Sequence, residues 1–167
     1  MQFKLRPWEI SDADNLAANG NNINISRFMT DGFPSPFTLE KAHQFIQKVS
    51  ADHPVKIFAI EIEGKAVGGI GIHPQEDIMK KNAELGYWLA ENYWGKGIIT
   101  EAIRQMIEYG FRNFNIVRIF ARPFGSNIGS QKALEKAGFI LEAKLEKTIF
   151  KNDQYEDELI YAIRKSR

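Results

Sequence analysis

Short apolar stretches, which alternate with polar residues at 2–6 and 82–90 and are more continuous at 117–122, predict seven β-strands. The predicted strands cover residues 2–6, 56–62, 65–73, 82–90, 117–122, 139–150 and 155–163. Apolar residues at helical spacing predict helices over 11–19, 38–50 and 97–113, and a fourth that begins at Ser126 or Asn127 and stops at Gly138. This order predicts an α/β (α+β) fold around one mixed sheet.

Short connections suggest which strands are neighbours in that sheet. Glu63 and Gly64 form a tight turn between two predicted strands, and the strand over 82–90 completes an antiparallel meander. The last two strands form a closing hairpin. Segment 21–37 has no regular period but carries several apolar side chains, so we expect it to pack down as a flap or to line a pocket.

Composition narrows the functional class. The 167 residues fit a single domain, 1–167, with a net charge of +1 and no basic stripe for a nucleic acid. No apolar run is long enough for a membrane helix and no apolar leader follows Met1, so we expect a cytoplasmic protein. Without cysteine, neither a thiol nucleophile nor a Cys-based metal site is possible. The three histidines show no ligand spacing, so we expect no metal and assign His43, His53 and His73 to surfaces or loops.

A glycine turn links the strand over 82–90 to the longest predicted helix. Gly95 and Gly97 let a ligand approach the backbone, and the first turn of a helix offers unpaired N–H groups and a partial positive charge. Together these features predict an anion site, most commonly for phosphate, although small residues at a helix start are also used for packing alone. The chain has no Gly-x-x-x-x-Gly-Lys-Ser/Thr motif, so this is not a P-loop, and the dinucleotide fingerprint Gly-x-Gly-x-x-Gly fails because position 100 is threonine.

A second pattern, Asn-x-x-Ser followed by Leu-Glu-Lys-x-Gly-Phe, occupies residues 127–139. With Tyr-Trp-Gly-Lys-Gly at 93–97, Thr-Glu-Ala at 100–102 and the closing Tyr155, Asp157 and Tyr161, the chain resembles the GNAT-type acetyl-CoA-dependent N-acetyltransferases. It is most similar to their RimJ/RimL-like branch, which acetylates the α-amino group of ribosomal proteins. Asn92 departs from the family pattern, which has Gln or Arg there. The resemblance implies a mostly antiparallel sheet of about seven strands with flanking helices and a splayed cleft that binds coenzyme A.

The resemblance also implies how the parts of acetyl-CoA are bound. N–H groups from Gly95 to Thr100 would bind the pyrophosphate, the edge of Trp88–Ala90 would pair with the pantetheine arm, and Asn127 would also bond that arm. The N–H of Leu89 or Ala90 would stabilise the oxyanion. Ser130 would give a proton to the leaving thiolate; its other interpretation is a first-turn hydroxyl with no role in the reaction. The other interpretation of Asn127 is a helix cap alone. The implied cofactor-binding residues are Trp88, Leu89, Ala90, Trp94, Gly95, Lys96, Gly97, Ile98, Ile99, Thr100, Asn127 and Ser130.

The general base has two candidates. Glu84 lies on the strand that leads to the glycine turn and would act through water; otherwise it is a structural partner or a solvated acid. Asp157 lies among apolar side chains on the last strand, where a structural hydrogen bond is its other interpretation.

The acceptor is predicted to be a primary amine, with the α-amino group of a peptide as first choice and a small amine as the alternative. Phe28, Met29, Phe33, Tyr87 and Asp157 are the substrate-binding candidates. Direct attack within a ternary complex is expected, since no cysteinyl acyl-enzyme can form. A homodimer is compatible with the resemblance, and an acetyl-CoA sensor without turnover is the alternative from another functional class.

Overall fold

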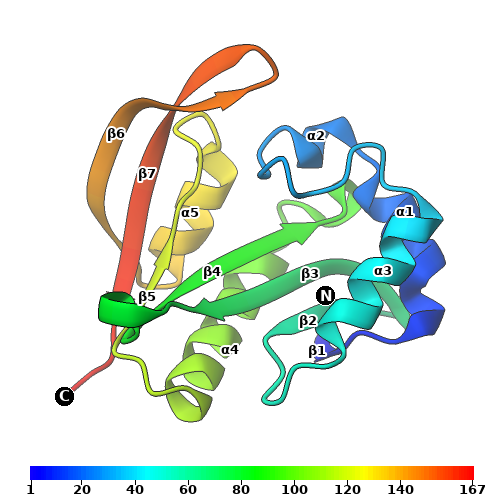
Figure 1. Cartoon of the computed structure of the whole chain (residues 1–167), viewed down its shortest axis with the longest axis horizontal. Coiled ribbons are helices and arrows are strands. Elements are labelled where there is room, and N and C mark those ends of the chain that lie inside the picture. The colour runs from blue at the N-terminus through cyan, green and yellow to red at the C-terminus, as the bar shows by residue number, and fades with distance from the viewer. The chain divides into compact units, whose positions relative to one another are not determined.

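The computed structural model describes all 167 residues and contains a seven-stranded sheet in the order β1-β2-β3-β4-β5-β7-β6 (Figure 1). The strands are β1 (Lys4–Pro7), β2 (Ile57–Ile62), β3 (Lys65–Pro74), β4 (Asn82–Leu89), β5 (Arg118–Ala121), β6 (Ile140–Lys151) and β7 (Gln154–Arg164). The β4–β5 pair is parallel, whereas β1–β2, β2–β3, β5–β7 and β6–β7 are antiparallel. A mixed, mostly antiparallel sheet of seven strands is therefore confirmed.

Five α-helices connect the strands. They are α1 (Ala13–Gly20), α2 (Ile23–Ser26), α3 (Leu39–Val49), α4 (Ile98–Asn113) and α5 (Ile128–Lys136), with short 3-10 turns η1 (Ile10–Asp12), η2 (Asp77–Met79) and η3 (Glu91–Tyr93). Helix α2 is not among the elements predicted from the sequence; it is one turn long and begins where the Asn22 side chain accepts a hydrogen bond from the N–H of Asn24. None of these helices is both long and apolar enough to span a bilayer.

The chain divides into two compact units. Unit 1 contains Met1–Gly71 and Tyr87–Ala102, and unit 2 contains Ile72–Gly86 and Ile103–Arg167. Strands β3 and β4 and helix α4 therefore each contribute residues to both units.

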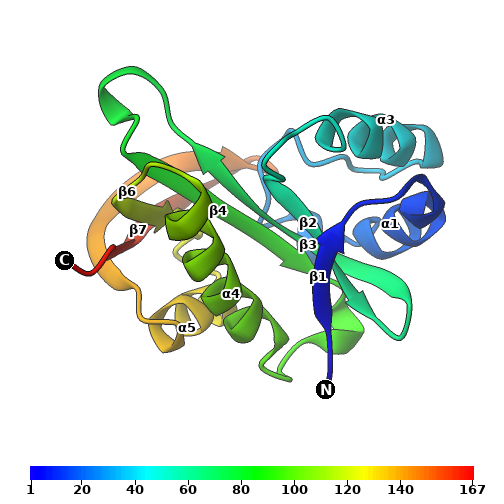
Figure 2. The same ribbon diagram turned by 90° about the horizontal axis from the view of Figure 1, so that it is seen from below.

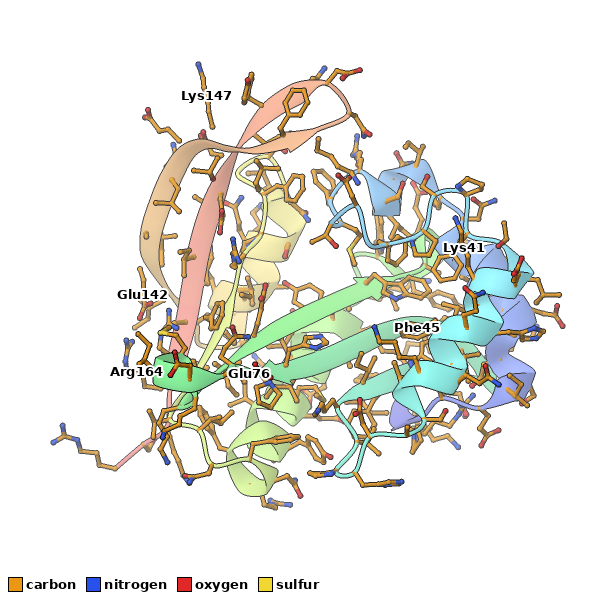
Figure 3. The ribbon with its side chains drawn as sticks, in the orientation of Figure 1. Lys41, Phe45, Glu76, Glu142, Lys147 and Arg164 are labelled. Carbon is orange, nitrogen blue, oxygen red and sulfur yellow. The ribbon has the colours of Figure 1, made fainter.

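In unit 1, helices α1 and α3 lie side by side (Figure 2). Their buried residues form one core with Trp8, Phe37 and Ala59. Phe45 of α3, labelled in Figure 3, packs edge-on against the Trp8 ring, with 5.7 Å between the centroids. Gly20 ends α1 under Phe37, where a Cβ atom would lie only 2.7 Å from the ring. This packing anchors one end of the irregular segment 21–37.

In unit 2, the two faces of the sheet differ in burial. Ala83 and Leu85 of β4 and Ile119 of β5 are buried, and Gly110 leaves room for the side chain of Ile119 beneath α4. The opposite face contains Glu84, which is only half buried and lies opposite Phe120 in the register of β4 and β5. We call this second face the Glu84 face.

The closing hairpin of β6 and β7 is held to β5 by charged side chains. The carboxylate of Glu142 accepts hydrogen bonds from Arg164 at 2.5 Å and from Arg118 at 2.6 Å (Figure 3 labels Glu142 and Arg164). On the opposite side, the Tyr161 hydroxyl donates to Glu135 of α5 at 2.8 Å. Burial and this hydrogen bond raise the pKa of Tyr161 to about 12, so it remains a neutral structural donor.

Candidate functional site

The glycine turn between η3 and α4 is an exposed cradle in unit 1. Gly95 and Gly97 have φ angles of 73° and 77°, a region that L-residues with side chains rarely adopt, and a Cβ atom at either position would meet nothing within 4 Å. Helix α4 begins directly after them at Ile98, and its first N–H groups have no acceptor within the helix. The backbone is therefore open to an anion that approaches from outside.

Two side chains hold the turn in place. Trp94 donates its indole N–H to the carbonyl oxygen of Leu89 at 2.7 Å, which fastens the turn to the end of β4. The Lys96 ammonium donates to the Asn92 carbonyl at 2.9 Å and lies 5.4 Å from the centroid of the Tyr93 ring. Because Lys96 is exposed and held by one neutral acceptor, its charge is available to an anion in the cradle.

The end of β4 comes unusually close to β3. A Cβ atom on Gly68 would lie 2.5 Å from the Trp88 carbonyl oxygen, so only glycine allows this approach. The Ala90 N–H donates to the Val67 carbonyl at 2.8 Å, and the Ala90 carbonyl accepts from Tyr93 at 2.9 Å. Both backbone groups of Ala90 are thus engaged, and its N–H is excluded as the oxyanion donor.

Leu89 remains as the candidate oxyanion donor. Successive N–H groups of a strand point to opposite edges, so the Leu89 N–H points away from β3 when that of Ala90 points toward it. The Leu89 carbonyl also points away and is taken by Trp94. The prediction for Leu89 is therefore carried forward.

Segment 21–37 of unit 1 packs its aromatic residues against one another and against Trp88. Phe33 lies edge-on to Trp88 at 5.9 Å and to Phe37 at 5.3 Å, measured between centroids, whereas Phe28 and Met29 are half buried. The same unit contains a polar cavity of about 450 Å³, lined by Ala18, Asn19, Asn21, Asn22, Ile23, Ala90, Glu91 and Asn92. The segment thus both packs down as a flap and lines a cavity.

Glu84 is the candidate general base, and its side chain lies on the Glu84 face. Burial raises its pKa, the nearby Arg122 lowers it, and the Glu158 carboxylate raises it further, with a net increase. The bond from the Gln75 N–H to the Asn82 carbonyl, at 2.9 Å, sets β3 against β4 so that His73 lies opposite Glu84. His73 is exposed, as the sequence predicts. Its position opposite Glu84 follows from the register between β3 and β4, which the spacing of the histidines in the sequence does not reveal.

Asn127 and Ser130 lie at the start of α5 in unit 2. The Asn127 side chain accepts the Ser130 N–H at 3.3 Å, which is the geometry of a helix cap. Gln131 donates to the carbonyls of Phe124 and Gly125, at 3.1 and 3.0 Å, and so fixes the preceding loop. The cap is thus established, while the roles of Asn127 and Ser130 toward a ligand stay predictions.

Asp157 has a structural role within the closing hairpin. Its carboxylate accepts the Lys147 N–H at 3.0 Å and lies 3.7 Å from the Lys144 ammonium. Lys147, labelled in Figure 3, has a φ of 52° where β6 bulges. We therefore do not retain Asp157 as a base.

The predicted site residues fall into two groups. Unit 1 contains Phe28, Met29, Phe33, Tyr87, Trp88, Leu89, Ala90, Trp94, Gly95, Lys96, Gly97, Ile98, Ile99 and Thr100, and unit 2 contains Glu84, Asn127, Ser130 and Asp157. No group of three or more His, Asp or Glu side chains is arranged to hold a metal ion.

The chain is similar over most of its length to known proteins. The profile of the family described as acetyltransferase (GNAT) domain matches residues 2–140. An uncharacterized N-acetyltransferase, p20 of Bacillus licheniformis, is 32% identical over 150 residues, which cover 86% of this chain and 82% of that protein. The ribosomal-protein-serine acetyltransferase of Escherichia coli (strain K12) is 35% identical over 107 residues, or 64% of this chain and 59% of that protein.

A relative with another acceptor and a solved structure extend the comparison. The spermidine N(1)-acetyltransferase of Escherichia coli (strain K12) is 25% identical over 157 residues, which cover 93% of this chain and 82% of that protein. The microcin C7 self-immunity acetyltransferase MccE, solved with acetyl-CoA and AMP, superposes with a TM-score of 0.83 at 29% identity. The superposition covers 98% of this chain and 93% of that one.

Proposed function

The chain belongs to the GNAT acetyltransferase family, and from that premise we propose that it moves the acetyl group of acetyl-CoA to the α-amino group of a peptide or protein. The observation that carries the proposal is the exposed glycine cradle at the start of α4, where two residues with positive φ leave the backbone open. A pyrophosphate fits such a site, because the helix start supplies N–H donors and a partial positive charge.

Three residues have separate roles in the proposed acetyl transfer. The neutral amine attacks the thioester carbon, a C–N bond forms and the C–S bond breaks. In our proposal the Leu89 N–H stabilises the oxyanion, Glu84 accepts the proton that the amine loses, and Ser130 gives a proton to the leaving thiolate. The raised pKa of Glu84 suits this work, since a base is most effective when its pKa approaches the working pH.

Charge in the closing hairpin favours a peptide over a polyamine, which would need several free carboxylates. Asp157 is held by the β6 bulge and Glu158 is bound by Arg122, whereas Glu156 accepts only from the neutral Ser126 hydroxyl and keeps an available charge. The apolar loop residues Phe28, Met29 and Phe33 add no negative charge. An α-amino group, with a pKa near ~8, is also neutral more often than a spermidine or lysine amine near ~10.4.

The first test of the proposal is thermal stabilisation by acetyl-CoA. At 100 times its dissociation constant a ligand stabilises the fold by about 2.7 kcal/mol, and each kcal/mol moves the midpoint by about 2–4 °C at this size. We expect a rise of about 5–11 °C in a thermal-shift assay. No rise at millimolar acetyl-CoA would contradict the cofactor assignment.

The acceptor is tested with three amines under the same conditions. We expect a peptide with a free N-terminus to be acetylated with higher kcat/KM than spermidine or than a lysine peptide with a blocked N-terminus. Thiol release measures each rate. Faster acetylation of spermidine would overturn the peptide assignment while leaving the acetyltransferase assignment intact.

Ser130→Ala tests the proton donor. The Asn127 cap binds the Ser130 backbone N–H, which alanine retains, so the helix start should survive. We expect kcat to fall about tenfold or more while the acetyl-CoA dissociation constant changes less than about twofold, since general acid catalysis contributes about 10²–10⁴-fold. Steady-state kinetics and calorimetry measure the two quantities. Unchanged kcat would exclude Ser130 as the donor.

A further inference from the structure

Arg122 and Glu158 form an ion pair in unit 2, and neither residue takes part directly in the proposed reaction. The Arg122 Nε atom lies 2.5 Å from one oxygen of Glu158, and the Thr148 hydroxyl donates to the other oxygen at 3.2 Å. The Glu158 side chain is buried, whereas that of Arg122 is half exposed. A buried carboxylate that is bound at both oxygens has a fixed position, and it holds the guanidinium in one place.

The register places this pair on the Glu84 face. Phe120 lies opposite Glu84. Arg122 lies one residue past the end of β5, between the Ala121–Tyr161 pair and the Phe124–Glu158 bridge, which share one register, so its side chain projects from the same side of the sheet as that of Phe120. Phe120 also lies opposite Ala162 of β7. Glu158 precedes Ala162 by four residues, an even number, so the Glu158 side chain also projects from the Glu84 face.

The other charged and titratable groups beside Glu84 come from three strands. His73 of β3 lies opposite it, Arg118 precedes Phe120 on β5, Arg122 follows the end of β5, and Glu158 comes from β7. Arg118 donates to the Asn82 side chain at 3.0 Å and to Glu142 at 2.6 Å, so its guanidinium is bound by partners other than Glu158. Arg122 is therefore the cation whose position relative to Glu84 a buried partner fixes.

We propose that Arg122 is a positioning residue for Glu84, and that Glu158 holds its guanidinium where it keeps Glu84 charged for the acceptor amine. The inference rests on the proposed function, because it assigns Arg122 to the base of that same reaction. The effects on the pKa of Glu84 agree with this geometry. Burial and the Glu158 carboxylate raise that pKa, and Arg122 lowers it. Substitutions of the two residues must therefore act in opposite directions.

Arg122→Gln removes the cation and leaves the Glu158 charge uncompensated, so Glu84 should bind its proton more tightly. The acid limb of the pH profile of kcat/KM then moves to higher pH. On that limb we expect kcat/KM to fall about three- to tenfold, with the alkaline plateau unchanged. Glu158→Gln should move the limb to lower pH, and Arg122→Lys, which keeps the charge, should restore much of the wild-type profile.

Thr148→Val is the matched control, because it removes one hydrogen bond to Glu158 but no charge. We expect it to leave the acid limb in place. The double variant Arg122→Gln/Glu158→Gln leaves no buried charge unpaired, so it can be measured even if Arg122→Gln alone does not fold. The acid limb of the double variant should lie at lower pH than that of Arg122→Gln. A double variant whose limb coincides with that of Arg122→Gln would contradict the opposition between the two charges.

The titration of Glu84 itself is a second readout, independent of turnover. The ¹³C shift of its carboxyl group, assigned by comparison with Glu84→Gln, is followed against pH in wild type and in each variant. We expect the Arg122→Gln midpoint to rise and the Glu158→Gln midpoint to fall. An unchanged midpoint, with kcat/KM reduced equally at every pH, would overturn the role of Arg122. If no amine is acetylated but the midpoints still move, the proposed function fails and the electrostatic inference stands.

Discussion

Alanine at both Gly95 and Gly97 is expected to lower acetyl-CoA affinity by about 100-fold or more. Each glycine has a positive φ, which costs about 1–2 kcal/mol for an L-residue with a side chain, so the loop must either strain or change its path. Each hydrogen bond to a charged group contributes about 1.5–3 kcal/mol, so the loss of two of them accounts for the expected change. The added methyl groups also stand where a phosphate would approach the backbone.

Gly64 provides a matched control for this experiment. It lies in the turn between β2 and β3 of the same unit, with a φ of 78° and nothing within 4 Å of an added Cβ atom. Gly64→Ala therefore has a comparable backbone strain but lies outside the cradle. Isothermal titration calorimetry should show unchanged acetyl-CoA affinity for Gly64→Ala. Equal affinity for the double variant and wild type would show that the cradle is only a helix start.

The elements that lead to the cradle could be predicted because their signals are local. The period of two over 82–90, the two glycines and the long apolar period after them lie within one short stretch of chain. The caps of α3 and α5 at Thr38 and Asn127 are local as well, since each side chain bonds an N–H three residues ahead. Helix α2 could not be predicted in the same way, because a single turn carries no periodic signal and only the Asn22 cap indicates it.

The chemistry around Glu84 could not be predicted, because it depends on register between distant strands. His73 and Glu84 face each other across a connection, and Arg122 reaches Glu158 over a separation that no spacing rule covers. The direction of the Ala90 N–H likewise follows from its pairing with Val67. A structural hydrogen bond at Asp157 could be expected from its apolar neighbours, but its partner at the β6 bulge is visible only in the fold.

Glu84→Gln is expected to reduce kcat/KM by about 10²–10³-fold, within the range that general base catalysis contributes. Glutamine keeps the shape of the side chain but accepts no proton. Because the folded protein raises the pKa of Glu84, wild-type activity should fall as the pH drops through that raised value, and this acid limb should disappear in the variant. The remaining pH dependence should be that of the acceptor amine, near ~8 for an α-amino group.

Two controls distinguish loss of the base from a general effect of the substitution and from titration of the amine. Glu76→Gln makes the same chemical change at an exposed position in the connection between β3 and β4 (Figure 3), and should leave kcat/KM within about twofold of wild type, as surface substitutions usually do. Acceptors of different basicity distinguish the two ionisations, since the limb of the amine moves with its pKa and the limb of Glu84 does not. A Glu84→Gln enzyme that keeps both its rate and its acid limb would remove Glu84 from the mechanism. The amine would then have to reach the thioester already neutral, a requirement that an α-amino group meets more readily than a polyamine.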